Sequence, residues 1–410
     1  MMKIGFLFNH DAGHQAGHLL PILNAVASTP SQIEIRAYVG GSDMRDIVLR
    51  GVEPKFAHRI KFVHLRTPPM VRPIARAADI FSPASRVARL VFNADAFRDL
   101  DALVAPERTS LILKDLIDEP SVKFIHVRHG AGDRAIGFHP SFAKFDLLLL
   151  QGEKYVRRLR KSGGLDGRNQ YALIGYPKFD QLPKHGVAKK FFDNDRPTVV
   201  YNPHFSPDWS SWYSMGEAVL DYFAGNRDFN LIFAPHVMLF NRRMHVSPET
   251  ARIAWRRRLA DRFRRCDNIH VDLDSANLFD MSYMNSADIY LGDISSQVIE
   301  FIARPRPCVF LNPRDVDWRG DENFSAWRLG PVLPDLSSLD GALARAVERP
   351  DEYALAQRAH FQDTFDLTAE PSAARAARAI VDFVAGETRR DQRETALPEI
   401  AIPAKVALSS

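Results

Sequence analysis

Small polar residues stand between a predicted strand and a predicted helix in the second half of the chain. Residues 288–291 form an apolar run typical of a short buried strand, and residues 297–303 carry apolar side chains at the spacing of a helix. Another short apolar run follows at residues 308–311. This order predicts a βαβ unit. The link between its first strand and its helix contains Gly292, Asp293, Ser295 and Ser296.

The start of that predicted helix is a candidate phosphate site. The first N–H groups of a helix have no partner within the helix, and the helix dipole is positive at this end, so both favour an anion. The alternative is that Ser295 or Ser296 only caps the helix, which serine does often. Both interpretations stay open unless other polar residues converge on the same point.

Two histidines follow predicted strands and could transfer protons. The strand at residues 122–127 is followed by His129 and Gly130, and the glycine lets a substrate approach the backbone. The strand at residues 230–234 is followed by His236. One imidazole could accept a proton from an attacking hydroxyl while the other, protonated, stabilises a leaving phosphate. For each, a histidine in a solvent-facing loop is the alternative.

A third polar loop is predicted at the same level of the fold. After the strand at residues 198–201 come Asn202 and His204. For these two residues, contact with a ligand and a purely structural role are equally open.

Near the N-terminus, three histidines recur at intervals of four residues, namely His10, His14 and His18. On a helix this spacing would align metal ligands. The glycines at positions 13 and 17 disfavour a helix there, so we expect no metal. The segment is predicted to be a glycine-rich turn that lines the cleft, where His14 could meet an acceptor.

The alternation of strands and helices along the chain indicates parallel sheets. Residues 182–196 are rich in Pro, Gly, Lys, Asn and Asp and mark a domain boundary. We therefore predict an α/β protein with two doubly wound Rossmann-like domains and a central cleft, the first at residues 1–185 and the second at residues 197–370. A helix at residues 371–387 could pack back on the first domain, and residues 388–410 are a polar tail.

Several elements are predicted within each domain. The first domain has strands at residues 3–8, 33–39, 61–65, 122–127, 145–150 and 171–174, with a helix at residues 19–28 and a largely helical stretch at residues 74–105. The second has strands at residues 198–201, 230–234, 269–271, 288–291 and 308–311, with helices at residues 216–223, 248–265, 277–285 and 339–348. The C-terminal helix is placed at residues 373–385.

Composition bounds the class of protein. The chain has 410 residues, 46% hydrophobic and 25% charged, which is enough for two domains with separate cores. Its two cysteines, Cys266 and Cys308, are far apart, which predicts reduced thiols rather than a disulfide framework. No apolar run approaches 18 residues and the start lacks a signal-peptide pattern, so we expect a cytoplasmic protein.

Arginine is concentrated at residues 252–265, although the net charge of the whole chain is only +4. Apolar residues at helical spacing predict a helix there with one apolar stripe. A solvated surface helix is one interpretation, and a helix resting on anionic lipid headgroups at the inner face of a membrane is the other. No nucleic acid is expected, because the sequence has no recognisable RNA- or DNA-binding module.

Taken in order, these motifs resemble the CDP-glycerol glycerophosphotransferase family, the teichoic-acid primases and polymerases with a fold of the glycosyltransferase-B type. The likeness covers about residues 124–343. The matching positions are His129–Gly130, the run from Gly175 to Leu182, the run from Tyr201 to His204, the run from Phe233 to His236, the run from Gly292 to Ser296, Arg319–Gly320 and Gly330–Pro331.

The sequence departs from the family pattern at several positions. Lys178 stands where arginine is usual, His204 replaces threonine, and Val237 follows His236 where the family has proline. The segment after His129 lacks the usual Thr-Pro-Leu-Lys, which affects the acceptor side more than the donor side.

The resemblance implies a CDP-polyol donor, transfer of glycerol phosphate to a surface polymer, glycan or lipid headgroup, and release of CMP without a cofactor. The residues it implies fall into three groups. His129 and His236 would be catalytic; Ser295, Ser296, Asp293, Gly292, Gly130, Asn202 and His204 would bind the donor; His14, Arg128 and Lys178 would lie on the acceptor side.

Three other functions stay open. A glycosyltransferase using a CMP- or UDP-sugar would need the same helix start. A UDP-sugar 2-epimerase-like enzyme would also need it, but it should add acidic groups for proton abstraction, and only Asp293 and Glu300 are near in sequence. A binding module would hold the nucleotide without turnover.

Overall fold

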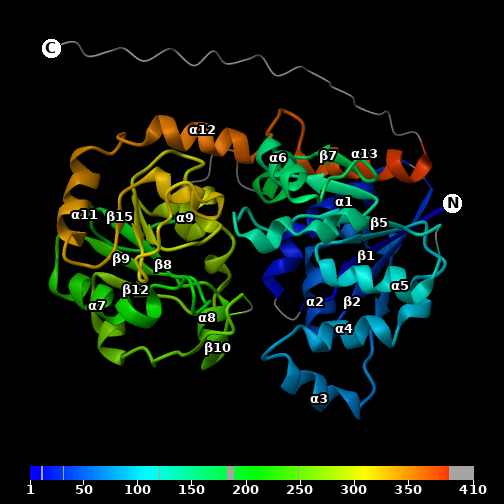
Figure 1. Ribbon diagram of the computed structural model, residues 1–410, viewed down its shortest axis with the longest axis horizontal. Coiled ribbons are helices and arrows are strands. Elements are labelled where there is room, and N and C mark those ends of the chain that lie inside the picture. The colour runs from blue at the N-terminus through cyan, green and yellow to red at the C-terminus, as the bar shows by residue number, and fades with distance from the viewer. Residues whose placement is uncertain (11–12, 31, 120, 182–188, 248, 387–410) are drawn as a thin grey trace.

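The computed structural model describes residues 1–386 except 11–12, 31, 120, 182–188 and 248. Two parallel sheets stand side by side with helices around them, the first in blue to cyan and the second in green to yellow (Figure 1). The predicted α/β architecture of two doubly wound sheets is therefore confirmed.

The first sheet has seven parallel strands in the order β3-β2-β1-β4-β5-β6-β7. Their bounds are β1 (Met2–Phe8), β2 (Ile33–Val39), β3 (Ile60–His64), β4 (Ala102–Ala105), β5 (Lys123–Val127), β6 (Leu147–Leu150) and β7 (Gln170–Leu173). The strands are apolar on both faces, because helices cover both. Large buried clusters lie on the two sides of the sheet.

Six of these strands were predicted, but β4 was not. It lies inside the stretch at residues 74–105 that was predicted to be largely helical, and this part of the prediction is wrong. All four residues of β4 are fully buried, so the strand has no alternation of apolar and polar side chains. A four-residue apolar run of this kind cannot be distinguished from a piece of buried helix by its period.

The second sheet has six parallel strands in the order β12-β9-β8-β13-β14-β15. Their bounds are β8 (Thr198–Asn202), β9 (Asn230–Phe233), β12 (Ile269–Val271), β13 (Ile289–Gly292), β14 (Cys308–Leu311) and β15 (Val332–Leu333). The predicted βαβ unit is confirmed, since β13 and β14 are parallel neighbours. Its helix α10 (Gln297–Phe301) is shorter than predicted.

Helices connect and cover the strands. The first half contains α1 (Leu20–Ser28), α2 (Ser42–Gly51), α3 (Val71–Ala78), α4 (Ala84–Val91), α5 (Ile112–Ile117) and α6 (Glu153–Ser162). The second half contains α7 (Trp212–Gly225), α8 (Met238–Asn241), α9 (Ser282–Ser286), α11 (Leu339–Glu348), α12 (Ala354–Thr364) and α13 (Ser372–Ala385). Helices α2, α5, α6, α8 and α12 were not predicted from the sequence. None of the described helices is long and apolar enough to cross a bilayer.

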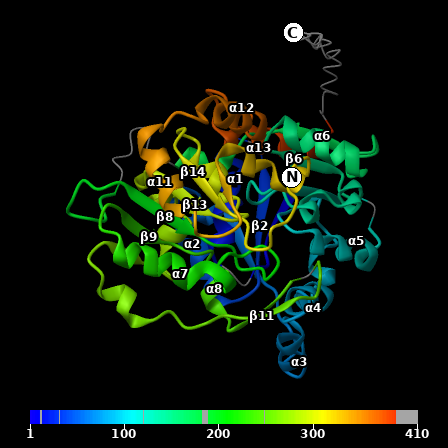
Figure 2. The ribbon, with the colours of Figure 1, turned by 60° about the vertical axis from the view of Figure 1, so that its left-hand side comes forward.

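The last helix, α13, returns to the first sheet. Its Ala376, Ala377 and Ile380 belong to the same buried cluster as α1, and the helix lies beside the blue strands in Figure 2. Asp180 fixes its start, because the carboxylate accepts hydrogen bonds from the backbone N–H groups of Ser372 (2.9 Å) and Ala373 (2.6 Å). The carboxylate thus satisfies two N–H groups that the helix leaves unpaired.

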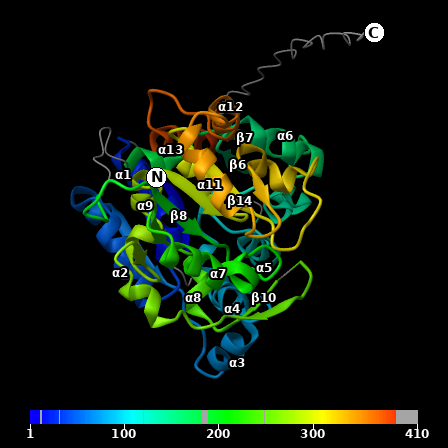
Figure 3. The same cartoon turned by 90° about the vertical axis from the view of Figure 1, so that its left-hand side faces the viewer.

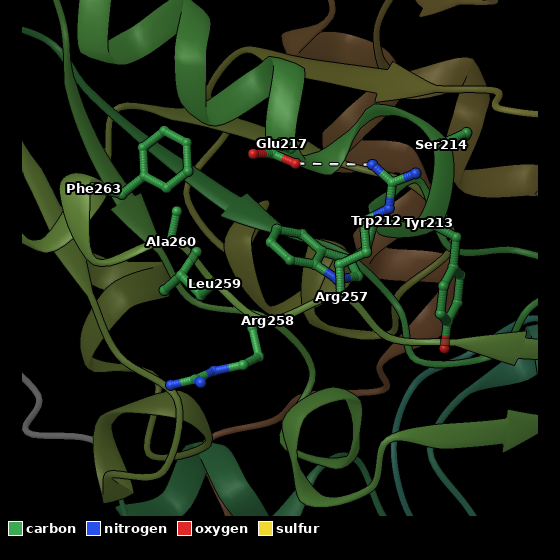
Figure 4. A pocket seen from close by; sticks show the side chains of 9 residues that line it. All are labelled: Trp212, Tyr213, Ser214, Glu217, Arg257, Arg258, Leu259, Ala260 and Phe263. Carbon is green, nitrogen blue, oxygen red and sulfur yellow. Dashed lines mark ion pairs between the residues drawn. The ribbon is translucent and has the colours of Figure 1, made fainter.

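The arginine-rich helix predicted at residues 248–265 is wrong, and its residue 248 lies outside the described residues. The segment contains strand β11 (Ile253–Trp255), which pairs antiparallel with β10 (Met244–Val246), then an extended run and a short 3-10 turn. Figure 4 shows residues 257–260 lying against the first turn of α7, around a pocket of about 30 Å³. Val246, Ile253 and Trp255 are β-branched or aromatic residues, which favour strands, and they lie in β10 and β11.

Two smaller predictions also change. The helix predicted at residues 277–285 is broken into a 3-10 turn and α9, because Met281 takes a left-handed conformation with φ 70°. The turn predicted around His14 is a 3-10 helix, Gly13–His18. With about three residues per turn, a 3-10 helix does not align residues four apart.

Candidate functional site

Each sheet reverses its strand order at one point. In the first sheet the order reverses between β1 and β4, and in the second between β8 and β13. In open parallel sheets of this kind, ligands bind outside the carboxyl ends of the strands at such a switch point. The loops that follow these four strands and β5 and β9 carry most of the predicted site residues.

At the first switch point, three polar side chains come together. His10 follows β1 and Glu107 follows β4, and Nδ1 of His10 lies 2.7 Å from Oε1 of Glu107, with both side chains buried. His129 follows β5, and its ring centroid is 5.8 Å from that of His10. The two strand ends therefore build a buried ion pair directly beside the predicted base.

The tautomer of His129 follows from its contact. Its Nδ1 lies 2.8 Å from the carbonyl oxygen of Pro106, which can only accept a hydrogen bond, so we assign the proton to Nδ1. Nε2 then has a free lone pair. Surrounding protein lowers the pKa of His129 to about 4, first by desolvation and next by the charge of His10. The residue is nevertheless exposed, so the neutral ring is open to a ligand.

Glu107 was not recognised in the sequence, because the strand it follows was missed. Its second oxygen accepts hydrogen bonds from Arg86 (3.0 Å) and Thr109 (2.7 Å). Burial alone would raise the pKa of this carboxyl, but the hydrogen bond and charge of His10, with the charge of Arg86, lower it to about 2. Glu107 is therefore ionised throughout the neutral range.

At the second switch point, Asp293 follows β13 and holds the surrounding loops. One oxygen accepts from the N–H groups of His204 (2.9 Å) and Ile294 (2.8 Å), and the other accepts from the N–H and hydroxyl of Ser211 (2.6 and 2.9 Å). Desolvation nevertheless raises the pKa of this fully buried carboxyl to about 6. Because both oxygens are occupied, the carboxylate positions loops and is not free to bind a donor.

The other predicted donor residues of this loop cluster are mostly buried. Asn202 donates to the carbonyl of Ala234 at 2.6 Å, which joins the ends of β8 and β9. Nδ1 of His204 accepts from the N–H of Ser206 at 3.0 Å, and burial holds the pKa of His204 well below its usual range. Gly292 ends β13 and is also buried. These contacts and this burial indicate structural roles for Asn202, His204 and Gly292.

His236 is half-buried beyond the end of β9. Its Nδ1 accepts a hydrogen bond from the backbone N–H of Met238 at 3.2 Å. The neutral ring must then carry its proton on Nε2. Its ring centroid is 5.4 Å from that of His204. A ring held in this way can donate a hydrogen bond through Nε2.

The two switch points meet where Gly130 lies against Ser296. A Cβ at Gly130 would stand 3.5 Å from Oγ of Ser296, and Gly130 has φ 68°, which favours glycine. Oγ of Ser295 accepts from the N–H of Gln297 at 3.3 Å, whereas Ser296, the N-cap residue of α10, makes no side-chain capping hydrogen bond. The N–H groups of Ser295 and Ser296 have no hydrogen-bond acceptor among the described residues.

Two of the residues predicted on the acceptor side, Lys178 and Arg128, are bound by other protein groups. Lys178 is held by Glu300, with Nζ 2.7 Å from Oε2. The guanidinium of Arg128 donates to the carbonyl oxygens of Gly132 (2.9 Å) and Gly137 and lies over two aromatic rings. Both predictions of acceptor contact are therefore unsupported, because these cations are already satisfied inside the protein. The side chain of His14 lies outside the described part of the structure.

Other features of the region bear on ligands. A hollow of about 410 Å³ lies at the carboxyl ends of β14 and β15 and is lined in part by Asn312, Trp318 and Arg319. Trp318 contacts Trp327, which donates to the backbone oxygen of Asp293 at 2.9 Å. Trp327 therefore lies between the hollow and the loop that contains Asp293, Ser295 and Ser296. Among the described side chains, no group of three His, Cys, Asp or Glu could hold a metal ion.

The fold, two Rossmann-like α/β domains of the glycosyltransferase-B type, is shared with solved structures of a wall teichoic acid polymerase and of UDP-N-acetylglucosamine 2-epimerases. The wall teichoic acid polymerase TagF, as an H444N variant with CDPG, is similar over 94% of this chain and 88% of its own, with TM-score 0.57 and 14% identity. A UDP-N-acetylglucosamine 2-epimerase is similar over 94% and 97%, with TM-score 0.58 and 14% identity.

A third solved structure belongs to the same class. The UDP-GlcNAc 2-epimerase from Neisseria meningitidis, bound to UDP-GlcNAc, is similar over 94% of this chain and 100% of its own, with TM-score 0.55 and 13% identity. Identities this low establish the shared fold alone. No protein-family model matches the chain, and no curated protein does so either.

Proposed function

We propose that this protein is a transferase that moves a glycerol-phosphate or related polyol-phosphate unit from a CDP-activated donor to a hydroxyl group and releases CMP. The observation that carries the proposal is the closeness of Gly130 to Ser296, since a Cβ at Gly130 would stand 3.5 Å from Oγ of Ser296. It places the loop of a neutral histidine, His129, against a helix start with two unpaired N–H groups. A proton acceptor and an anion site are what phosphoryl-type transfer requires.

The donor would lie along the second sheet. The N–H groups of Ser295 and Ser296 and the hydroxyl of Ser296 would donate to the pyrophosphate oxygens. Because α10 has only five residues, its dipole adds less than these direct hydrogen bonds. The nucleoside half would occupy the hollow beside Trp318 and Arg319, a volume within the ordinary range of small-molecule sites.

The proposed reaction is a displacement at phosphorus. The acceptor oxygen forms a bond to the phosphorus that bears the polyol, the bond from that phosphorus to the bridging oxygen breaks, and CMP leaves with that oxygen. The imidazole of His129 takes the acceptor proton, a role that typically contributes about 10² to 10⁴ in rate. Nε2–H of His236 would donate to the leaving phosphate.

A UDP-sugar 2-epimerase-like reaction is the second candidate, and one observation favours it. The carboxylate of Glu107 lies at the first switch point, where an epimerase would need an acid or base. The two carboxylates considered in the sequence are occupied, since Asp293 binds backbone N–H groups and Glu300 binds Lys178. Glu107 is itself ion-paired, so we rank transfer first.

The acceptor could be presented at an anionic membrane surface, but not by the helix expected at residues 248–265. Helix α3 protrudes from the first half of the molecule in all three views (Figures 1–3). Met70, Ile74 and Phe81, on α3 and its flanking turns, are 86%, 72% and 72% exposed. The same segment has exposed arginines at positions 66, 72 and 76. We call these six residues the α3 surface.

The β10–β11 hairpin extends this surface. Trp255 is 70% exposed, and Arg242, just before β10, donates to the carbonyl oxygen of Asp79 at 3.0 Å. The hairpin is thereby tied to the end of α3. Exposed apolar groups and exposed arginines in one segment suit a bilayer with anionic headgroups.

Calorimetry of the purified protein with CDP-glycerol, CDP-ribitol, UDP-GlcNAc and CMP tests the donor, repeated on Ser296→Ala and His236→Asn. We expect a CDP-polyol to bind best and Ser296→Ala to weaken it. Nucleotide products are then followed by chromatography with and without an added polyol-phosphate acceptor. Conversion of UDP-GlcNAc to its epimer would favour the second candidate, and binding without any product would indicate a binding module.

A further inference from the structure

His10 and Glu107 form a buried ion pair that the proposed reaction does not use. Their side chains are each about 5% exposed, and Nε2 of His10 has no hydrogen-bond partner among the described residues. A buried ion pair is weak evidence for stability, because desolvation opposes the attraction. An unpaired ring nitrogen adds a further cost. The charge of Glu107 can stabilise the fold, but stability gives no reason for leaving Nε2 of His10 unpaired beside His129.

The pair occupies a position defined by the fold. His10 and Glu107 follow β1 and β4, the two strands between which the first sheet reverses its order. Arg86 of α4 holds the second oxygen of Glu107 at 3.0 Å. The pair thus stands where ligands bind in open parallel sheets, directly behind His129.

The groups that face His129 come from three segments. The N-terminal segment contributes His10 and His18, with ring centroids 5.8 and 6.4 Å away. The loop after β4 contributes the carbonyl of Pro106 at 2.8 Å and the charge of Glu107. The third segment is that of His129 itself, which contributes Arg128 and the buried imidazole of His126.

We propose that His10 and Glu107 are positioning residues for His129: Glu107 holds the His10 ring beside His129, and the charge of His10 opposes protonation of the His129 ring, so that its Nε2 stays available as a base as the pH falls. The contact with Pro106 fixes the Nδ1–H tautomer, and the charge of His10 supplies the electrostatic effect. The proposal rests on the proposed function only for the identity of the hydroxyl that His129 would deprotonate.

The charges of His10 and Glu107 shift the pKa of His129 in opposite directions. Burial lowers the pKa of His129 most, the positive charge of His10 lowers it next, and the negative charge of Glu107 raises it by less. Removing the charge of His10 should therefore raise the pKa of His129. A nearby charge of this kind typically shifts a pKa by about one unit or more, which is about ten-fold in proton affinity.

NMR of the full chain with ¹⁵N-labelled histidine tests the proposal without any substrate. The His129 signals are assigned by their loss in His129→Asn. We expect the wild-type ring to have its proton on Nδ1 and to titrate near pH 4, and His10→Gln to move the midpoint up by about one pH unit. His18→Gln is the matched control, because its ring also faces His129, and it should leave the midpoint near the wild-type value.

An unchanged midpoint in His10→Gln, or an equal shift in His18→Gln, would overturn the proposal. Thermal unfolding checks that each variant is folded, and His10→Asn replaces His10→Gln if the latter does not fold. With a CDP-polyol as substrate, the acidic limb of kcat/KM should move with the NMR midpoint while donor affinity stays unchanged. Absence of turnover in the wild type would count against the proposed function, whereas the NMR result would still decide the role of His10.

Discussion

Lys178 and Glu300 form an ion pair that joins the two halves of the molecule. Nζ of Lys178 lies 2.7 Å from Oε2 of Glu300, and the hydroxyl of Tyr176 donates to the same carboxylate at 2.7 Å. Glu300 belongs to α10, the helix whose start carries Ser296. The segment after β7 therefore anchors the proposed anion site to the first sheet.

Lys178→Met should destabilise the protein by about 3 kcal/mol, because it leaves the buried carboxylate of Glu300 without its cation. Thermal and urea unfolding of the two proteins would measure the difference. The double variant Lys178→Met with Glu300→Gln should recover part of the loss, since it removes the unpaired charge. A single variant as stable as the wild type would show that the ion pair does not hold the helix.

Gly130→Ala should weaken donor binding, because a Cβ would enter the space beside Oγ of Ser296 at 3.5 Å. Gly163→Ala is the matched control. Both glycines have positive φ, so both variants should lose about 1 kcal/mol of stability, but a Cβ at Gly163 would meet no atom within 4 Å. Calorimetry with the donor should show a loss only for Gly130→Ala. An equal loss in both would point to a general effect of backbone strain.

The stability of the protein should depend on pH through Glu107. Its pKa in the folded protein, about 2, is below the unfolded value of about 4.5. A depressed carboxyl pKa stabilises the fold above pH 4.5, and this contribution is lost as the pH falls toward 2. Glu107→Gln should therefore be less stable than the wild type by about 3 kcal/mol at pH 7, and the gap should close in acid.

Urea unfolding at several pH values between 3 and 7 measures that gap. Other carboxylates titrate in both proteins, so only the difference between wild type and Glu107→Gln is informative. A difference that stays constant with pH would mean that the charge of Glu107 makes no net contribution.

Replacing the apolar residues of the α3 surface should weaken binding to anionic vesicles. The triple variant Met70→Ser, Ile74→Ser and Phe81→Ser should lose at least about ten-fold in affinity for phosphatidylglycerol vesicles, since each side chain contributes apolar area. Leu355→Ser is the control, because Leu355 is 81% exposed on α12, outside the α3 surface. Flotation measures both, and equal flotation would remove the α3 surface from the proposal.

Most strands and the βαβ unit were predictable because their apolar runs have a clear length and period. The run at residues 308–311 matches β14 (Cys308–Leu311), and the run at residues 33–39 matches β2. The same argument failed for β4, which is buried on both faces, and at residues 248–265, where the spacing of apolar residues suited a helix but the chain forms a hairpin. Period alone does not distinguish these cases.

The sequence by itself determined the class of fold and the loops that could hold a site, because strand ends and their polar residues can be found along the chain. Only the tertiary structure decided which side chains are free. Arg128 and Lys178 are held by partners 9 and 122 residues away, and Glu107 meets His10 only because β1 and β4 are neighbours in the sheet. The partner of a buried charge is chosen by packing between distant segments, and no local pattern in the sequence records that choice.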